Sequence, residues 1–136
     1  MAKVTFLLGL GGSGKTPLSE QLKAETGAEV FESLIHNKTC PALIQCLREG
    51  KDCIVEEIMY CIPSYRDQIM QCLSQVTGLQ VQWICFENDL ESANWNISHR
   101  TYKGDPEGHR QFNEQMHPHY VYPEGAEIRP FTRIAL

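Results

Sequence analysis

The sequence has 136 residues, of which 42 % are hydrophobic and 21 % are charged, as is typical of one globular domain with a modest core. The formal net charge of −5 argues against a strongly electrostatic nucleic-acid binder. No apolar run approaches the ~20 residues that a membrane span needs, so we expect no membrane partner.

A short apolar strand is expected at residues 3–8, and it is apolar on both faces, as a central parallel strand is. The next eight residues, Gly9-Leu10-Gly11-Gly12-Ser13-Gly14-Lys15-Thr16, fit the phosphate-binding pattern G-x-x-x-x-G-K-[ST] without a mismatch. We call residues 9–16 the glycine loop. A helix with Leu18 and Leu22 on one face follows and ends at Gly27. Strand, glycine loop and helix together form the context in which this pattern binds phosphate.

The residue types of the glycine loop suit this chemistry. Glycines allow a tight turn that aims successive backbone N–H groups at one anion, and the helix N-terminus behind them adds partial positive charge. Lys15 can place its ammonium near the β and γ phosphates, and the Thr16 hydroxyl can ligate Mg²⁺. The alternative is a glycine-rich surface turn that happens to carry Lys-Thr. The predicted nucleotide-binding residues are Gly9, Gly11, Gly12, Ser13, Gly14, Lys15 and Thr16.

Strands and helices alternate through the rest of the chain. Further strands are expected at 28–32, 53–58, 79–86 and within 128–136, and helices at 39–50, 64–78 and 89–100. This alternation predicts a single α/β domain over residues 1–136, a three-layer sandwich with a mostly parallel five-stranded sheet. A ligand would then bind at the carboxyl ends of the strands.

Residues 101–119 are polar and contain few aliphatic side chains, so they can bury little apolar surface. We expect a mobile excursion there, with a short helix over 108–116, and call residues 101–119 the candidate lid. Asn94, Trp95 and Asn96 form a polar cluster before it, which we interpret as a helix with one packed tryptophan, with contact to the nucleotide or the acceptor as the alternative.

Carboxylates stand at the predicted ends of two strands. Glu32 ends the second strand, and Glu56 and Glu57 follow the apolar run of the third. Adjacent residues of a strand point to opposite faces, so at most one of the last two would face the phosphates. We favour Glu56, because it directly ends the apolar run. Which of Glu32, Glu56 and Glu57 acts as a base stays open.

Two other features narrow the class of protein. The guanine-reading motif N-K-x-D is absent, which excludes a Ras-type GTPase. None of the six cysteines forms a C-x-x-C pair, so we expect reduced core thiols rather than a zinc or redox motif.

Because the chain starts with a strand rather than a signal peptide, we expect a cytoplasmic protein.

The layout resembles the small predicted kinases of the P-loop nucleoside, nucleotide and polynucleotide kinase superfamily. The resemblance implies a P-loop NTPase fold, ATP and Mg²⁺ as cofactors, and strand-end acids that orient the acceptor or the metal. It also implies lid arginines on the transferred phosphoryl group, here Arg100 and Arg110. The catalytic residues that it implies are Lys15, Glu56, Arg100, Arg110 and Glu32, with Thr16 and Glu56 at the metal.

The function implied is transfer of the γ-phosphate of ATP to a small hydroxyl or phosphate acceptor. A nucleoside, a nucleotide or the 5′-hydroxyl end of a nucleic acid is favoured as the acceptor. The alternatives are a nucleotide-binding regulatory or interaction protein, and a weak ATPase that uses water. The acceptor, ATP against GTP and the oligomeric state stay open.

Overall fold

A parallel five-stranded sheet forms the centre of the computed structural model, which describes residues 2–99 and 104–134. The strands lie in the order β2-β3-β1-β4-β5, and every neighbouring pair is parallel. Their bounds are β1 (Lys3–Leu8), β2 (Glu29–Glu32), β3 (Cys53–Glu56), β4 (Gln80–Phe86) and β5 (Glu127–Arg129). The predicted three-layer α/β architecture is therefore confirmed.

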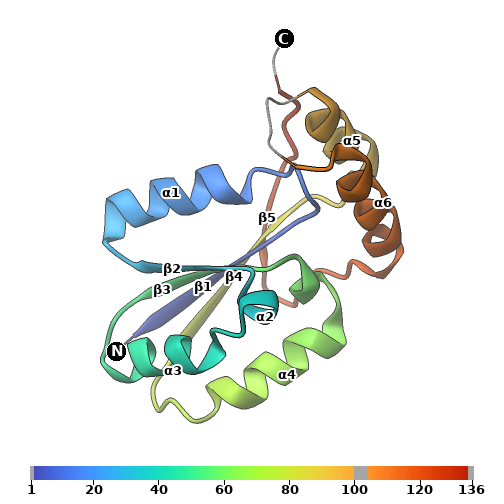
Figure 1. Cartoon of the computed structure of the whole chain (residues 1–136). Helices are drawn as coiled ribbons and strands as arrows, with labels where there is room; N and C mark the ends of the chain where they lie inside the picture. The colour runs from blue at the N-terminus through green and yellow to red at the C-terminus, as the bar shows by residue number, and fades with distance from the viewer. Residues whose placement is uncertain (1, 100–103, 135–136) are drawn as a thin grey trace.

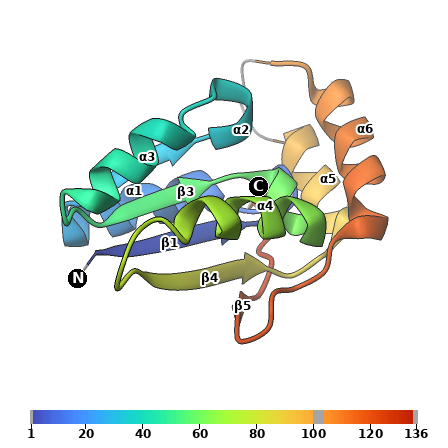
Figure 2. The same ribbon diagram turned by 90° about the horizontal axis from the view of Figure 1, so that it is seen from below.

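Helices cover both faces of this sheet (Figures 1 and 2). Helix α1 (Lys15–Thr26) lies on one face, and α2 (Leu34–Asn37), α3 (Cys40–Arg48) and α4 (Pro63–Leu73) lie on the other. Helices α5 (Leu90–His99) and α6 (Pro106–Met116) pack against each other near the carboxyl ends of the strands. Two 3₁₀ turns, η1 (Ile58–Cys61) and η2 (His117–His119), complete the elements. None of the described helices combines the length and the apolarity that a membrane crossing requires.

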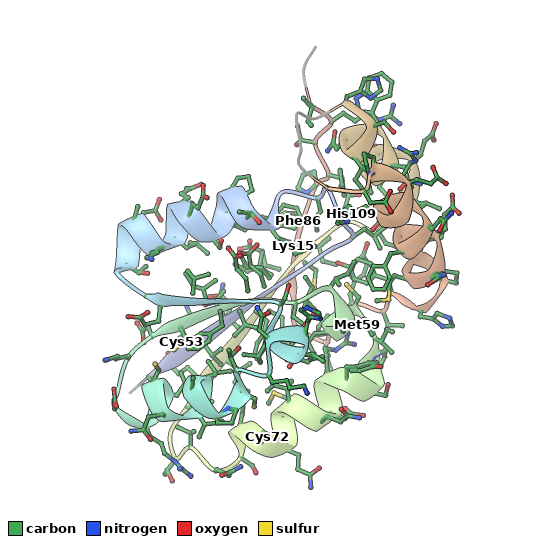
Figure 3. All side chains as sticks on the ribbon, in the orientation of Figure 1. Lys15, Cys53, Met59, Cys72, Phe86 and His109 are labelled. Atoms are coloured by element: carbon green, nitrogen blue, oxygen red, sulfur yellow. The ribbon has the colours of Figure 1, made fainter. Side chains whose placement is uncertain are left out.

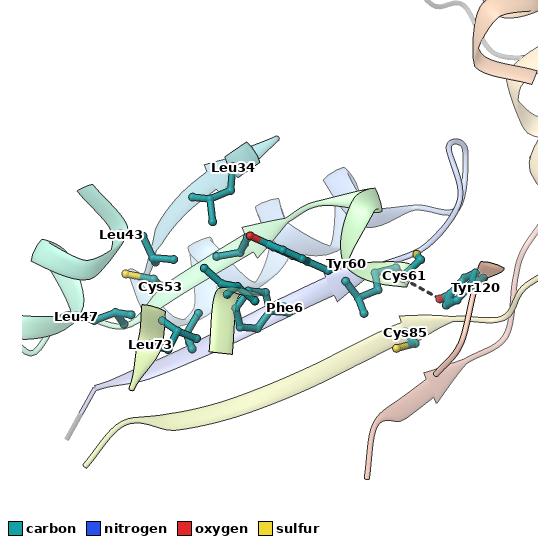
Figure 4. Close-up of a cluster of buried hydrophobic side chains, with 14 of the residues drawn as sticks. Phe6, Leu34, Leu43, Leu47, Cys53, Tyr60, Cys61, Leu73, Cys85 and Tyr120 are labelled. Atoms are coloured by element: carbon teal, nitrogen blue, oxygen red, sulfur yellow. Dashed lines mark hydrogen bonds between the residues drawn. The ribbon is translucent and has the colours of Figure 1, made fainter. Parts of the chain in front are cut away.

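Each face of the sheet buries its own apolar cluster, because successive side chains of a strand point to opposite faces. On the α3 and α4 side, Phe6 stacks on Trp83 with ring centroids 4.3 Å apart. Phe6 also forms a T-shaped pair with Tyr60, at a centroid distance of 5.5 Å (Figure 4). On the α1 side, Leu7 packs with Leu18 in a smaller cluster. The described cysteines are all free thiols, and three of them are buried.

Several strands and helices begin or end at other residues than expected. Strand β3 ends at Glu56 rather than residue 58, and helix α4 begins at Pro63 without a side-chain cap. Before α5, the Asp89 carboxylate accepts from the Ser92 amide at 3.0 Å, whereas Asn88 donates to the His117 carbonyl. The spacing of Asn88 and Glu91 in the sequence predicts Asn88 as the cap of this helix, but Asp89 caps it and the Asn88 side chain binds another segment.

Residues 120–122 do not form the strand that their composition favours. Tyr120 is buried, and its hydroxyl donates to the carbonyl of Phe86 at 2.6 Å. The Val121 amide donates to the Cys61 carbonyl at 3.0 Å. This segment therefore ties the end of β4 to the turn η1, and β5 pairs with β4 only at residues 127–129.

Candidate active site

The glycine loop connects β1 to α1 at the carboxyl edge of the sheet. In the strand register Leu7 lies beside Glu56, and Glu56 lies beside Glu32. The parallel pairing therefore brings both strand-end carboxylates to the edge that carries the loop. Figure 3 shows Lys15, Phe86 and His109 facing this region from α1, β4 and α6.

A cavity of about 750 Å³ opens at this edge. Most of the glycine loop forms one wall, and the ends of β2 and β3, helix α6 and the segment after β5 form the others. Its lining comprises residues 11–17, Glu32, Ser33, residues 56–58, Phe86, Asn96, His109, Phe112, Asn113, Pro130, Thr132 and Ile134. The cavity is large enough for a nucleotide and a small second ligand.

The backbone of the glycine loop takes conformations that favour glycine. Gly12 has φ +86° and Gly14 has φ +105°, both in the left-handed region. The Ser13 hydroxyl is buried in the loop and has no hydrogen-bond partner among the described residues. A buried polar group of this kind calls for a partner, and a phosphate oxygen in the cavity would supply one.

Lys15 folds back over the loop that precedes it. Its ammonium donates to the carbonyl of Gly9 and, at 3.2 Å, to that of Leu10. The positive charge is thereby held beside the backbone that would surround the phosphates. The role predicted for Lys15 from the motif stays a prediction.

Glu56 lies behind the loop, 6 % exposed, and accepts hydrogen bonds from two hydroxyls of α1. Thr16 Oγ1 donates to Oε1 at 2.9 Å, and Ser19 Oγ donates to Oε2 at 2.8 Å. Burial raises the pKa of this carboxyl, although the two hydroxyls act in the opposite direction. The Thr16 hydroxyl and the Glu56 carboxylate thus form a pair of hard oxygen donors suited to Mg²⁺.

The Glu57 carboxylate forms hydrogen bonds with backbone amides. Its carboxylate accepts from the Ile35 amide at 3.0 Å and from the Met59 amide at 3.1 Å. Glu57 therefore caps η1 and fixes the start of α2. Glu32, by contrast, is an exposed residue at the cavity wall formed by β2.

The two predicted arginines are placed differently. Arg110 lies on α6, donates to the Ser98 hydroxyl at 3.1 Å and pairs with Glu107. It is not among the described residues that line the cavity. Arg100 and residues 101–103 of the candidate lid lie outside the described part of the chain, so the role of Arg100 stays a prediction.

Two asparagines join the glycine loop to its surroundings. Asn113 of α6 binds both polar backbone groups of Gly11, and Asn96 of α5 donates to the Gly12 carbonyl at 2.9 Å. Asn96 also binds the chain after β5, through the Thr132 carbonyl and the Ile134 amide. Asn96 belongs to the polar cluster noted in the sequence, whereas no sequence pattern singled out Asn113.

The Glu56 interaction predicts an effect of pH on stability. Because the folded state raises the pKa of Glu56, it holds this proton more tightly than the unfolded chain does. The unfolding free energy should therefore fall as pH rises from the ordinary glutamate pKa through the raised value, and Glu56→Gln should remove this fall. Urea unfolding of both proteins across this range measures the difference, and parallel profiles would contradict the prediction.

Comparison with known proteins gives structural relatives only. No protein-family model matches the chain, and no curated protein sequence matches it significantly. A sugar kinase from Janibacter sp. HTCC2649 superposes with a TM-score of 0.71 and 14 % identity, over 96 % of this chain and 85 % of its own. For a gluconokinase from Sinorhizobium meliloti 1021 the TM-score is 0.67 and the identity 14 %, over 98 % and 84 %.

A third solved structure is that of Kti12 from Chaetomium thermophilum in complex with ADP-AlF3. It superposes with a TM-score of 0.63 and 16 % identity, over 93 % of this chain and 88 % of its own. All three similarities extend over nearly the whole chain, so they concern the complete sheet and its helices. The chain therefore shares the α/β fold of these three proteins.

Proposed function

We propose that this chain is a Mg²⁺- and ATP-dependent phosphotransferase that moves the γ-phosphoryl group of ATP to a hydroxyl of a small acceptor. One observation carries the proposal. A single cavity of about 750 Å³ is lined both by the glycine loop and by the strand-end Glu32. A phosphate site and a carboxylate that can bind an acceptor hydroxyl therefore open into the same space.

The donor side follows from the glycine loop. Its amides and Lys15 would bind the phosphates of ATP, and the buried Ser13 hydroxyl would gain a hydrogen-bond partner. Thr16 and Glu56 would hold Mg²⁺, whose charge offsets that of the phosphates. Phosphoryl transfer depends mostly on position and charge neutralisation, and these residues supply both.

On the acceptor side, Glu32 would orient the attacking hydroxyl and take its proton. A positioned carboxylate of this kind is a common general base. The gluconokinase and sugar kinase among the structural neighbours support a sugar hydroxyl, whether free or within a nucleoside or a polynucleotide end. Arg100 would stabilise charge on the transferred group, and Arg110 would do so only after leaving Glu107.

A second candidate function is nucleotide binding by a regulatory protein with slow turnover. The observation that favours it is the placement of Arg110, which binds Ser98 and Glu107 rather than facing the cavity. In this function the loop would bind a nucleotide without a dedicated acceptor. A weak ATPase, with water as the acceptor, is a variant.

Labelled ATP tests the proposed function directly. With Mg²⁺, the protein should transfer label to at least one member of a panel of sugars, sugar acids, nucleosides, nucleotides and 5′-hydroxyl oligonucleotides. Tight ATP binding without transfer to any of them would favour the regulatory function. Phosphate release at the same rate without an added acceptor would indicate an ATPase.

Glu32→Gln is expected to lower the transfer rate about 100-fold, because the amide cannot take a proton. The affinity for ATP should change much less than the rate, since Glu32 ends β2 and lies on a different wall of the cavity from the glycine loop. The matched control is Glu29→Gln, an exposed glutamate at the start of the same strand. Equal rates for Glu32→Gln and Glu29→Gln would remove Glu32 from the mechanism.

A further inference from the structure

We infer that Asn113 positions the glycine loop for nucleotide binding and makes helix α6 respond to the nucleotide. The inference rests on the proposed function, because it assigns a partner to the same loop. It concerns a residue that touches neither phosphate nor acceptor in the scheme above. Asn113 acts through Gly11 and is therefore a positioning residue.

The Asn113 side chain forms hydrogen bonds with both the amide and the carbonyl of Gly11. Its Oδ1 accepts from the Gly11 amide at 2.7 Å, and its Nδ2 donates to the Gly11 carbonyl at 3.0 Å. The same Nδ2 donates to Asn94 Oδ1 at 3.2 Å, which fixes the orientation of the amide. Asn113 is 0 % exposed and Gly11 is half-buried, so these hydrogen bonds are partly shielded from water.

Gly11 belongs to a turn, so neither a strand ladder nor a helix sets the direction of its peptide groups. Asn113 supplies the missing constraint. A Cβ atom at residue 11 would lie 3.3 Å from Asn113 Oδ1, so the side chain contacts the loop as closely as packing allows. The direction of peptide groups is what makes a glycine loop bind an anion, and Asn113 helps to set it.

The same side chain also links two parts of the cavity. Phe112 precedes Asn113, and His109 lies one helical turn before it on α6, and both line the cavity. Asn113 therefore connects helix α6, which a ligand in the cavity would contact, with the glycine loop, which the nucleotide would contact. Because coupling between sites is reciprocal, nucleotide binding at the loop should stabilise α6.

The test compares Asn113→Ala with Met116→Ala. Met116 is buried on the same helix one turn further along, so its truncation loosens α6 without touching Gly11. In calorimetry with Mg²⁺ and ADP, Asn113→Ala should weaken binding at least about tenfold, since two hydrogen bonds that orient the loop backbone are lost. Met116→Ala should stay within about threefold of the wild type.

Hydrogen exchange supplies a second readout. The Gly11 amide should exchange slowly in the free wild type and in Met116→Ala, but rapidly in Asn113→Ala, where its acceptor is gone. ADP should slow the exchange of the α6 amides in the first two proteins and not in the third. Equal ADP affinity of Asn113→Ala and wild type, or an equal loss in Met116→Ala, would overturn the inference.

These outcomes separate the inference from the proposed function. A wild type that binds neither ADP nor ATP would contradict the function, while the Gly11 exchange rate would still test the positioning. If Asn113→Ala does not fold, Asn94→Ala removes only the acceptor that orients the Asn113 amide. That variant should weaken ADP binding about threefold and speed the exchange of Gly11, and wild-type values for both would overturn the inference.

Discussion

Replacing Lys15 by alanine is expected to lower the rate of phosphoryl transfer about 1000-fold, with a smaller loss of nucleotide affinity. The Lys15 ammonium lies against the carbonyls of Gly9 and Leu10, at the point where the loop would surround the phosphates. Charge that develops on the transferred group would gain more from this ammonium than the bound substrate does. The loss should therefore appear mainly in kcat rather than in KM.

Lys51→Ala is the matched control, because Lys51 is an exposed lysine whose partner is the exposed Glu49, at 3.2 Å. Exposed pairs of this kind contribute little to stability, so this variant should keep its activity and fold. Steady-state rates with labelled ATP, together with urea unfolding of each variant, separate a catalytic defect from a folding defect. A Lys15→Ala protein with wild-type turnover would remove the mechanism proposed for the glycine loop.

The glycine loop and the sheet could be predicted because their signals are local. Eight consecutive residues carry the phosphate-binding pattern, and the apolar runs before and after them define strands and helices. The convergence of Glu32 and Glu56 also follows from sequence, since parallel strands align their carboxyl ends. The register in the structure agrees with this part of the prediction.

The contacts of Glu57 could not be predicted, because they depend on where strand β3 ends. Its position next to Glu56 predicted a side chain on the opposite face of a continuing strand, but β3 ends at Glu56. Glu57 instead binds the amides of Ile35 and Met59. Free backbone amides at the starts of short helices attract a carboxylate, and their positions depend on the chain far from Glu57.

The candidate lid was predicted only in part. The expected short helix over 108–116 is confirmed as α6, over residues 106–116, but the scarcity of aliphatic side chains in 101–119 gave no sign of what holds this helix in place. A buried polar side chain, Asn113, anchors the helix to a glycine 102 residues earlier. Counting apolar residues cannot find such an anchor, because an asparagine in a polar stretch has the composition of a surface residue. The pairing of Arg110 with Glu107, by contrast, follows the helical i, i+3 spacing.

The second large effect is a loss of stability expected for Gly12→Ala, because Gly12 packs closely against α5. Gly12 has φ +86°, and a Cβ atom there would lie 2.8 Å from the carbonyl oxygen of Ala93. Alanine would therefore combine an unfavourable left-handed backbone with a collision against helix backbone, which cannot move aside cheaply. We expect a loss of about 2–4 kcal/mol in unfolding free energy, the sum of conformational strain and overpacking.

Gly27→Ala separates these two costs. Gly27 has φ +73°, the same left-handed region, but among the described residues nothing beyond its own chain neighbours lies within 4 Å of the position its Cβ would take. This variant should lose only about 1 kcal/mol, the conformational cost alone. Urea unfolding measures both losses, and the excess for Gly12→Ala reports the close contact between the loop and Ala93.

Gly12→Ala and Gly27→Ala should also differ in their affinity for nucleotide. Gly12→Ala has to displace either the loop or the start of α5, and Asn96 ties that helix to the Gly12 carbonyl. The loop amides would then no longer converge on one anion, so ADP affinity should fall, whereas Gly27→Ala at the far end of α1 should keep it. If Gly12→Ala bound ADP normally and lost no more stability than Gly27→Ala, the close packing of α5 against the loop could not be what shapes the phosphate site.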